Sequence, residues 1–197
     1  MKPYILFFVG LIFLLPGCSN DQSEMGDRNF RSGDYEGAIA AYTEHLRLNP
    51  NDLTTLYNRG RAYQEIGKSE KALEDFQNVI RQDPENINAL LSVANDYFTR
   101  LRDYENALFY AEKVLKVNPN AMAFTLKGKA LQKMGRLDDA MSAYNDALST
   151  NDSYADAYLS RGSLFIYLNR NPRACSDFEK AGALGLEVEQ YLEKYCN

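Results

Sequence analysis

The sequence repeats a pattern of small and large residues every 34 positions, which restricts the chain to a fold of stacked copies of one unit. The first ladder of small residues is Gly26, Gly60, Ala94, Gly128 and Gly162. The second is Ala38, Ala72, Ala107, Ala140 and Ala174, followed four residues later by Tyr42, Phe76, Ala111, Tyr144 and Phe178. Small and large residues that recur in step indicate one packing unit repeated along the chain. Such an array presents a long surface, so we expect binding rather than catalysis.

Each unit is predicted to be a pair of helices, A and B. In the second unit Leu56, Gly60 and Tyr63 lie on one helical face, and Ala72 and Phe76 begin the next. The A helices are expected over 22–31, 53–66, 87–100, 121–134 and 155–168, and the B helices over 35–48, 69–82, 104–117, 137–150 and 172–184. Three B helices should end at the pairs Asn49-Pro50, Asp83-Pro84 and Asn118-Pro119, because proline cannot continue a helix. Unit three carries one extra residue near Leu101-Arg102.

These units closely resemble the tetratricopeptide repeat family. Unit two shows the family pattern as Leu56, Gly60, Tyr63, Ala72, Phe76 and Pro84, and unit four as Phe124, Gly128, Leu131, Ala140, Tyr144 and Ala147. The resemblance implies an all-α, right-handed superhelix over 25–185, with repeats at about 19–52, 53–86, 87–120, 121–154 and 155–185. Residues 186–197 would form a capping helix. The first repeat fits least well, since Gln22 and Asn29 stand where large apolar residues are preferred, so its first helix is expected to fray.

The N-terminus has the features of an export signal. Lys2 is followed by the almost entirely apolar stretch 4–15, which is shorter than the ~20 residues needed to span a bilayer. The ending Leu15-Pro16-Gly17-Cys18 resembles the lipobox of bacterial lipoproteins, which would make 1–17 a signal peptide and Cys18 the lipid-bearing residue. Residues 18–24 would then be a short anchored linker. The alternative is an ordinary secretory signal that leaves a soluble protein.

Composition gives little support for catalysis or for nucleic-acid binding. The formal charge of −5 offers no basic field for nucleic acid. His45 is the single histidine and lies on the buried stripe of the first B helix, where packing explains it. Without a second histidine or a cluster of ligands, we expect no metal, no cofactor and no catalytic nucleophile–base pair.

Cys175 and Cys196 remain once Cys18 is assigned to the lipid. An even remainder in an exported protein suggests a disulfide, which would clamp the capping helix. The same region looks like the terminal repeat of many exported bacterial repeat proteins. The alternative is two small, partly buried thiols.

The family geometry implies that the A helices line a concave groove. The positions that it assigns to this groove are Tyr57, Asn58, Arg61, Asn95, Phe98, Lys129, Lys133, Ser163 and Tyr167. Asparagine could hold a peptide backbone, cations a carboxylate, and aromatic rings an apolar side chain. The alternative is a solvated helix face with scattered aromatic residues. The carboxylate clamp of cochaperone repeats is not matched, since Ser92, Met122 and Leu126 stand where Asn, Lys and Arg would be needed.

The sequence therefore predicts a lipid-anchored, non-enzymatic adaptor of the bacterial cell envelope that holds a partner peptide or helix. The membrane implied is the outer one, on its periplasmic side. Two alternatives stay open. The chain could be a self-associating structural subunit, or an enzyme or small-molecule receptor whose site carries no recognisable motif.

Overall fold

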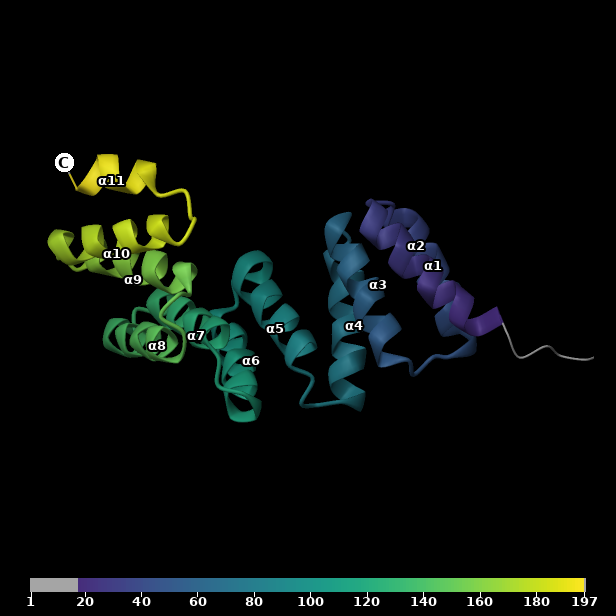
Figure 1. Ribbon diagram of the computed structural model, residues 1–197. Helices are drawn as coiled ribbons and strands as arrows, with labels where there is room; N and C mark the ends of the chain where they lie inside the picture. Colours follow the sequence, from purple (N-terminus) through teal and green to yellow (C-terminus); the bar gives the residue numbers. More distant parts are fainter. Residues whose placement is uncertain (1–17, 197) are drawn as a thin grey trace, which may run out of the picture.

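The computed structural model describes residues 18–196 and shows five antiparallel helical hairpins followed by one further helix (Figure 1). The A helices are α1 (Cys18–Ser32), α3 (Leu53–Glu65), α5 (Ile87–Asp96), α7 (Ala121–Lys133) and α9 (Ala155–Tyr167). The B helices are α2 (Tyr35–Leu48), α4 (Ser69–Gln82), α6 (Tyr104–Val117), α8 (Leu137–Thr150) and α10 (Asn171–Ala183). The π-helical segment η1 (Tyr97–Leu101) extends α5, and α11 (Glu189–Tyr195) ends the array. The predicted all-α fold of stacked hairpins is confirmed.

Close approach of the two helices explains why the ladders pair glycine with an aromatic ring. A Cβ atom placed on Gly128 would lie 2.5 Å from Cε1 of Tyr144, and one on Gly60 would lie 2.6 Å from Cε1 of Phe76. Both rings are fully buried. The A helix therefore lies directly on the ring of its own B helix, and the interior is too densely packed for an added methyl group. This contact sets the spacing within the hairpins of units one, two, four and five.

Unit three packs its two helices through different residues. Here Ala94 faces Ala111, both fully buried, and the aromatic volume moves to Tyr97 and Tyr110, whose rings stack 5.5 Å apart. The extra residue predicted near Leu101-Arg102 is absorbed by the π-helical turn of η1 and by Arg102, which has a φ of 53°. Insertion of one residue is the usual origin of a π-bulge. The inserted turn leaves the packing of the adjacent hairpins in register.

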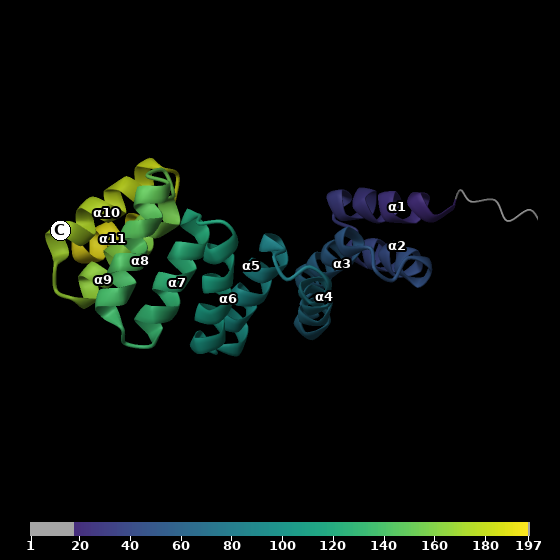
Figure 2. The same cartoon turned by 90° about the horizontal axis from the view of Figure 1, so that it is seen from below.

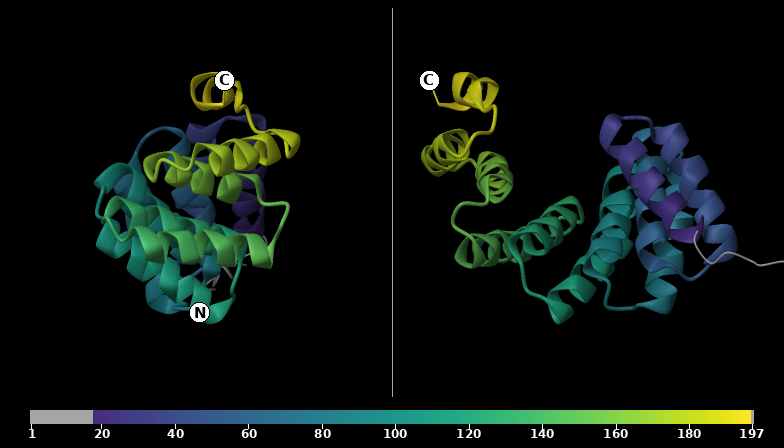
Figure 3. Two further views of the ribbon diagram at one scale, coloured as in Figure 1. Left: turned by 90° about the vertical axis from the view of Figure 1, so that its left-hand side faces the viewer. Right: turned by 45° about the vertical axis from the view of Figure 1, so that its right-hand side comes forward.

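Each hairpin packs on the next, and the array curves (Figures 2 and 3). Successive A helices contact one another, namely α1 with α3, α5 with α7 and α7 with α9. The prolines act as expected, since α2, α4 and α6 end one residue before Asn49, Asp83 and Asn118. The A helices therefore form the inner wall of the curve and the B helices the outer wall.

The first helix is longer than the sequence analysis predicts. Residues 18–24, expected to be a linker, form the first turns of α1, and the helix continues to Ser32 without a break. Among the contacts that hold it, the hydroxyl groups of Ser23 and Thr55 are hydrogen-bonded at 3.0 Å, and Gly26 packs under Tyr42. No glycine or proline lies between Cys18 and Met25, so a helix held at Ser23 extends toward its N-terminus at little cost. The expected signal peptide, 1–17, lies outside the described residues.

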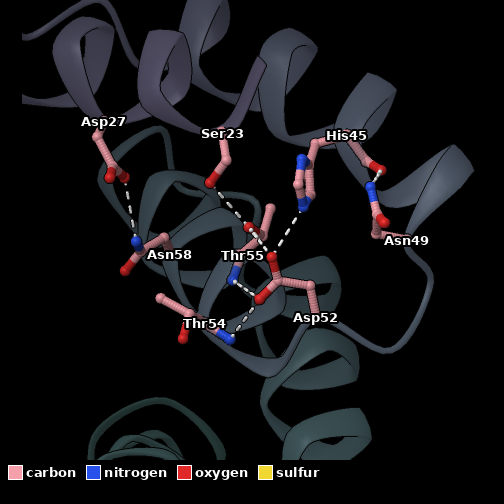
Figure 4. Close-up of polar contacts among 8 residues, drawn as sticks. All are labelled: Ser23, Asp27, His45, Asn49, Asp52, Thr54, Thr55 and Asn58. Carbon is pink, nitrogen blue, oxygen red and sulfur yellow. Dashed lines mark hydrogen bonds and ion pairs between the residues drawn. The ribbon is translucent and has the colours of Figure 1, made fainter. Parts of the chain in front are cut away.

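A polar network joins the first two units where α2 turns into α3 (Figure 4). The carboxylate of Asp52 accepts hydrogen bonds from the backbone of Thr54 and Thr55 and thereby caps α3. It also accepts the Thr55 hydroxyl at 2.9 Å, and its Oδ2 lies 2.8 Å from Nε2 of His45. His45 is only 4% exposed. The histidine thus has the structural role predicted for it, packed against the cap of the next helix.

The terminal helix α11 covers the last hairpin. Cys175 in α10 and Cys196 form a disulfide with a Cα–Cα distance of 5.6 Å. Tyr191 lies on the ring of Phe178, with ring centroids 5.1 Å apart. These contacts cover the apolar end of the array, which would otherwise face solvent. The seven core clusters of the described residues draw only on residues from Phe30 to Cys196, so a fragment 19–197 contains all of them.

Candidate binding groove

One position on each A helix supplies a polar side chain to the concave wall. It is the residue directly after the small-residue ladder, and it recurs as Asp27, Arg61, Asn95, Lys129 and Ser163. One residue along a helix rotates the side chain by about 100°, so the ladder residue faces its B helix while its successor faces sideways into the curve. All five line hollows of the inner wall. The repeat that builds the core therefore also builds the groove.

The N-terminal hollow lies between α1 and α3 and has a volume of about 240 Å³. Its lining residues are Asp27, Phe30, Arg31, Tyr42, Asn58 and Arg61. The Tyr42 hydroxyl donates to Oδ1 of Asp27 at 2.7 Å, and Nδ2 of Asn58 donates to the same oxygen at 3.1 Å. Burial of the Tyr42 phenol and its hydrogen bond to Asp27 raise the pKa of Tyr42 well above its usual value. The hydroxyl therefore stays protonated and keeps Asp27 fixed at neutral pH.

The central hollow, of about 200 Å³, combines aliphatic and polar side chains. Leu91 comes from α5, while Met122 and Leu126 come from α7, and Met122 is 50% exposed. Asn95, Lys129, Tyr154 and Asp156 complete the lining. An exposed methionine beside leucines offers an adaptable apolar surface. This hollow is suited to an apolar side chain.

The third hollow, of about 260 Å³, follows directly, because Lys129 and Asp156 border both. It takes Phe98 from η1, Lys133 from α7, and Leu159 and Ser163 from α9. Tyr191 reaches it from α11, so the cap contributes to the groove as well as covering the core. Nζ of Lys129 lies 2.6 Å from Oδ2 of Asp156, with both side chains about one-third exposed. The ion pair therefore lies at the border between the two hollows and neutralises both charges there.

The size of the three hollows bears on what they can hold. Sites for drug-sized molecules usually enclose ~300–1,000 Å³. The concave hollows hold about 200, 240 and 260 Å³ and open onto one surface, so each has the volume for one or two side chains. Within residues 18–196 no three His, Cys, Asp or Glu side chains come together as metal ligands, and no helix is long and apolar enough to cross a membrane. The hollows are therefore sized for individual side chains rather than for a drug-sized molecule.

Comparison with known proteins agrees with the observed fold of stacked helical hairpins. Models of the tetratricopeptide repeat family match residues 27–91, 96–121 and 125–185, and together these cover most of the chain. The chain is a tetratricopeptide repeat (TPR) protein. It is therefore an interaction scaffold, since TPR domains bind protein partners.

Relatives share the repeat rather than the whole protein. The human tetratricopeptide repeat protein 6 is 30% identical over 82% of this chain and 38% of its own length. A DnaJ homolog subfamily C member 3 homolog from Dictyostelium discoideum is 26% identical over 77% of this chain and 34% of its own length. The chain thus spans about a third of the length of the curated relatives that it matches.

Solved structures support the same fold. The crystal structure of the MamA protein is 27% identical, has a TM-score of 0.72, and is matched over 90% of this chain and 94% of its own. PilW, described as a widely conserved type IV pilus biogenesis factor, has a TM-score of 0.78 at 19% identity, over 90% of this chain and 83% of its own. At that identity the PilW likeness supports only the fold.

Seven of the nine predicted groove residues line the three hollows of this TPR array. Asn58 and Arg61 lie in the N-terminal hollow, Asn95 in the central one, and Lys129 in both the central and the third. Phe98, Lys133 and Ser163 line the third. Tyr57 instead packs against Phe76 in a core cluster, with ring centroids 5.5 Å apart, and Tyr167 is 67% exposed outside the hollows.

Most of the apolar lining was not predictable from the repeat pattern. The apolar and aromatic lining residues that were not predicted are Phe30, Tyr42, Leu91, Met122, Leu126, Tyr144, Tyr154, Leu159 and Tyr191. Part of the signal was present, because Met122 and Leu126 depart from the polar residues of the cochaperone clamp. Arg31 and the groove role of Asp27 were also missed, although Asp27 has the same place after the ladder as Arg61.

Proposed function

We propose that this protein is a non-enzymatic adaptor of the bacterial cell envelope that holds an extended segment or a helix of another protein in its concave groove. The observation that carries the proposal is the set of three side-chain-sized hollows on the inner wall, of which the central and third adjoin. It combines aliphatic, aromatic and cationic groups along successive A helices. A peptide that contacts several such hollows gains affinity from apolar anchors and orientation from the polar groups between them.

The location of the adaptor follows from its N-terminal sequence. The apolar stretch 4–15 and the ending Leu15-Pro16-Gly17-Cys18 support export and attachment of a lipid to Cys18. The outer membrane, on its periplasmic side, is the proposed location. Mass spectrometry of the mature N-terminus tests this: a diacylglycerol-modified Cys18 supports the anchor, and an unmodified N-terminus at another residue contradicts it.

Paired photo-cross-linking tests the groove itself. A photoreactive residue at position 122 reports on the concave wall, and one at position 109 reports on the outer helix α6. The two native side chains make a matched pair, because Met122 and Phe109 are each 50% exposed. We expect a defined adduct with another protein from position 122 and none with that protein from position 109. The same adduct from position 109 alone would place the binding face on the outer wall.

The competing proposal is a structural subunit that assembles with itself. Light scattering of the fragment 19–197 distinguishes the two. An adaptor with a free groove is a monomer at micromolar concentration, whereas a self-associating subunit gives a larger, concentration-dependent mass. A cross-link from position 122 to a second copy of the same chain would also favour self-assembly.

A further inference from the structure

Two arginines face the N-terminal hollow without an acidic partner. Arg31 from α1 and Arg61 from α3 both line it, and in the described part of the chain neither makes an ion pair. Arg59, two residues before Arg61, shows the contrast, because it binds both oxygens of the buried Asp75 at 2.7–2.8 Å. Arg59 faces the core side of α3 and Arg61 the groove. Of Arg59 and Arg61, only Arg61 keeps its donors available to a ligand.

The Arg61 side chain is positioned, although it is exposed. Its guanidinium carbon lies 4.7 Å from the centroid of the Phe30 ring, within the range of a cation–π contact. Phe30 and Arg61 both line the hollow, so this contact holds the guanidinium beside it. Arg31 and Arg61 come from different helices and line the same hollow as Tyr42. A pre-positioned arginine loses less conformational freedom on binding than a free one.

The charges of this hollow define the ligand that would neutralise it. Arg31 and Arg61 carry two positive charges and Asp27 one negative charge, which leaves a net of +1. Asp27 is held by Tyr42 and Asn58, so it cannot turn away from an incoming anion. A monovalent carboxylate balances the hollow. A phosphate dianion would leave an excess negative charge beside Asp27.

From this arrangement we propose that the hollow binds a single carboxylate side chain, of Glu or Asp, on the partner segment that occupies the groove. The inference rests on the proposed adaptor function and specifies the chemistry of its partner. Guanidinium groups bind carboxylates through parallel N–H donors, and two arginines on different helices can contact the two oxygens of one group. The residues differ from those of the cochaperone clamp, which this sequence lacks.

A small probe tests the pocket without knowledge of the partner. N-acetyl-glutamate N-methylamide is titrated into the fragment 19–197 labelled with ¹⁵N-arginine, and the Nε–H signals are followed by NMR. We expect saturable shifts of Arg31 and Arg61 in the millimolar range, which weaken as salt rises from about 20 to about 500 mM. Arg47, which is paired with Glu44 on the outside of α2, serves as the internal control. N-acetyl-glutamine N-methylamide is the matched neutral probe.

Substitutions distinguish the effect of the arginine charge on probe binding from the effect of the planar guanidinium. Arg31→Gln and Arg61→Gln should each lower the affinity for the glutamate probe about tenfold. Arg61→Lys keeps the charge but loses the planar guanidinium. Its affinity for the glutamate probe should therefore lie between those of the wild type and Arg61→Gln. Unchanged far-UV circular dichroism shows that the fold is intact. Equal shifts at all arginines, equal effects of the neutral probe, or stronger binding of inorganic phosphate than of the glutamate probe would each overturn the proposal.

A second readout separates this inference from the adaptor function. In the cross-linking experiment, the double variant Arg31→Gln, Arg61→Gln should reduce the adduct formed from position 122 at least tenfold. If the adduct forms undiminished, the carboxylate pocket is wrong while the adaptor function stands. If position 122 gives no adduct even in the wild type but the glutamate probe binds as expected, the pocket stands and the adaptor function fails.

Discussion

The contact between Gly128 and Tyr144 predicts how strongly the array depends on its glycine ladder. In Gly128→Ala, the new methyl carbon would lie 2.5, 2.7 and 3.0 Å from Cε1, Cδ1 and Cζ of Tyr144. The ring is fully buried, and its hydroxyl donates to Oε1 of Gln132 at 2.8 Å. The methyl group therefore meets the rigid edge of a ring that is held at its far end.

The expected loss of stability is the difference between two opposing effects. Replacing glycine by alanine inside a helix favours folding by about 1 kcal/mol. Overpacking of a dense interior costs about 1–3 kcal/mol, and a displaced Tyr144 hydroxyl costs a further ~1 kcal/mol. We therefore expect a net loss of about 1–3 kcal/mol in the free energy of unfolding. For a chain of this size each kcal/mol lowers the melting temperature by about 2–4 °C.

Urea unfolding of the fragment 19–197, followed by circular dichroism, measures the effect. A double-mutant cycle with Tyr144→Ala provides the internal control, because it recreates the alanine pair that Ala94 and Ala111 form naturally in unit three. Without the ring, Gly128→Ala should become stabilising by about 1 kcal/mol. If Gly128→Ala is neutral or stabilising in the wild-type background, or if its effect is the same with and without the ring, the close-approach argument is refuted.

Other predictions concern ion pairs, acid stability and the cap. Asp75→Asn should cost about 3 kcal/mol, because it removes the buried carboxylate that pairs with the partly buried Arg59 guanidinium, whereas Asp139→Asn on the surface should cost under ~0.5 kcal/mol; equal costs in urea unfolding would contradict this. Burial raises the pKa of Asp52, but its hydrogen bonds from Thr55 and His45 lower it more, so the folded-state pKa is below the usual value. The stability that Asp52 contributes is therefore present above pH ~4 and is lost as pH falls through the folded-state pKa. The loss of unfolding free energy caused by Asp52→Ala, measured in urea, should accordingly shrink toward pH ~2; a loss that stays constant with pH would contradict this. Cys196→Ser should cost on the order of 3 kcal/mol and raise hydrogen exchange first in α11; uniform exchange along the array would show that the disulfide does not act on the cap.

Much of this fold is determined by local sequence. A glycine and an aromatic ring 16 residues apart identify one hairpin, and four of the five units carry that signal, with an alanine pair in the same role in unit three. Proline marks the ends of three B helices because its effect is local to the backbone. The extra residue near Leu101-Arg102 was visible, but its absorption as a π-helical turn depends on the packing of Tyr97 against Tyr110. The extension of α1 likewise depends on the Ser23–Thr55 contact, which joins residues 32 positions apart.

The groove was only partly predictable. Its polar members follow the ladder by one residue, so a single period locates Arg61, Asn95, Lys129 and Ser163. The pairing of Lys129 with Asp156 was not visible, because it depends on the rotation between α7 and α9 and on the rotamers of both side chains. Tyr191 enters the groove only because the cap folds back over the last hairpin. The periodicity of the sequence thus locates the residues of the inner wall. The curvature of the folded array determines which of them line the same hollow.

The most direct test is a methyl NMR footprint of the array with the partner segment recovered by cross-linking. The central claim predicts shifts at the concave methyl groups of Leu91, Met122, Leu126 and Leu159, with little change at Leu48 and Val117, which are exposed on B helices. Shifts confined to Leu48 and Val117, with the concave methyl groups unchanged, would contradict it and place the binding surface on the outer wall.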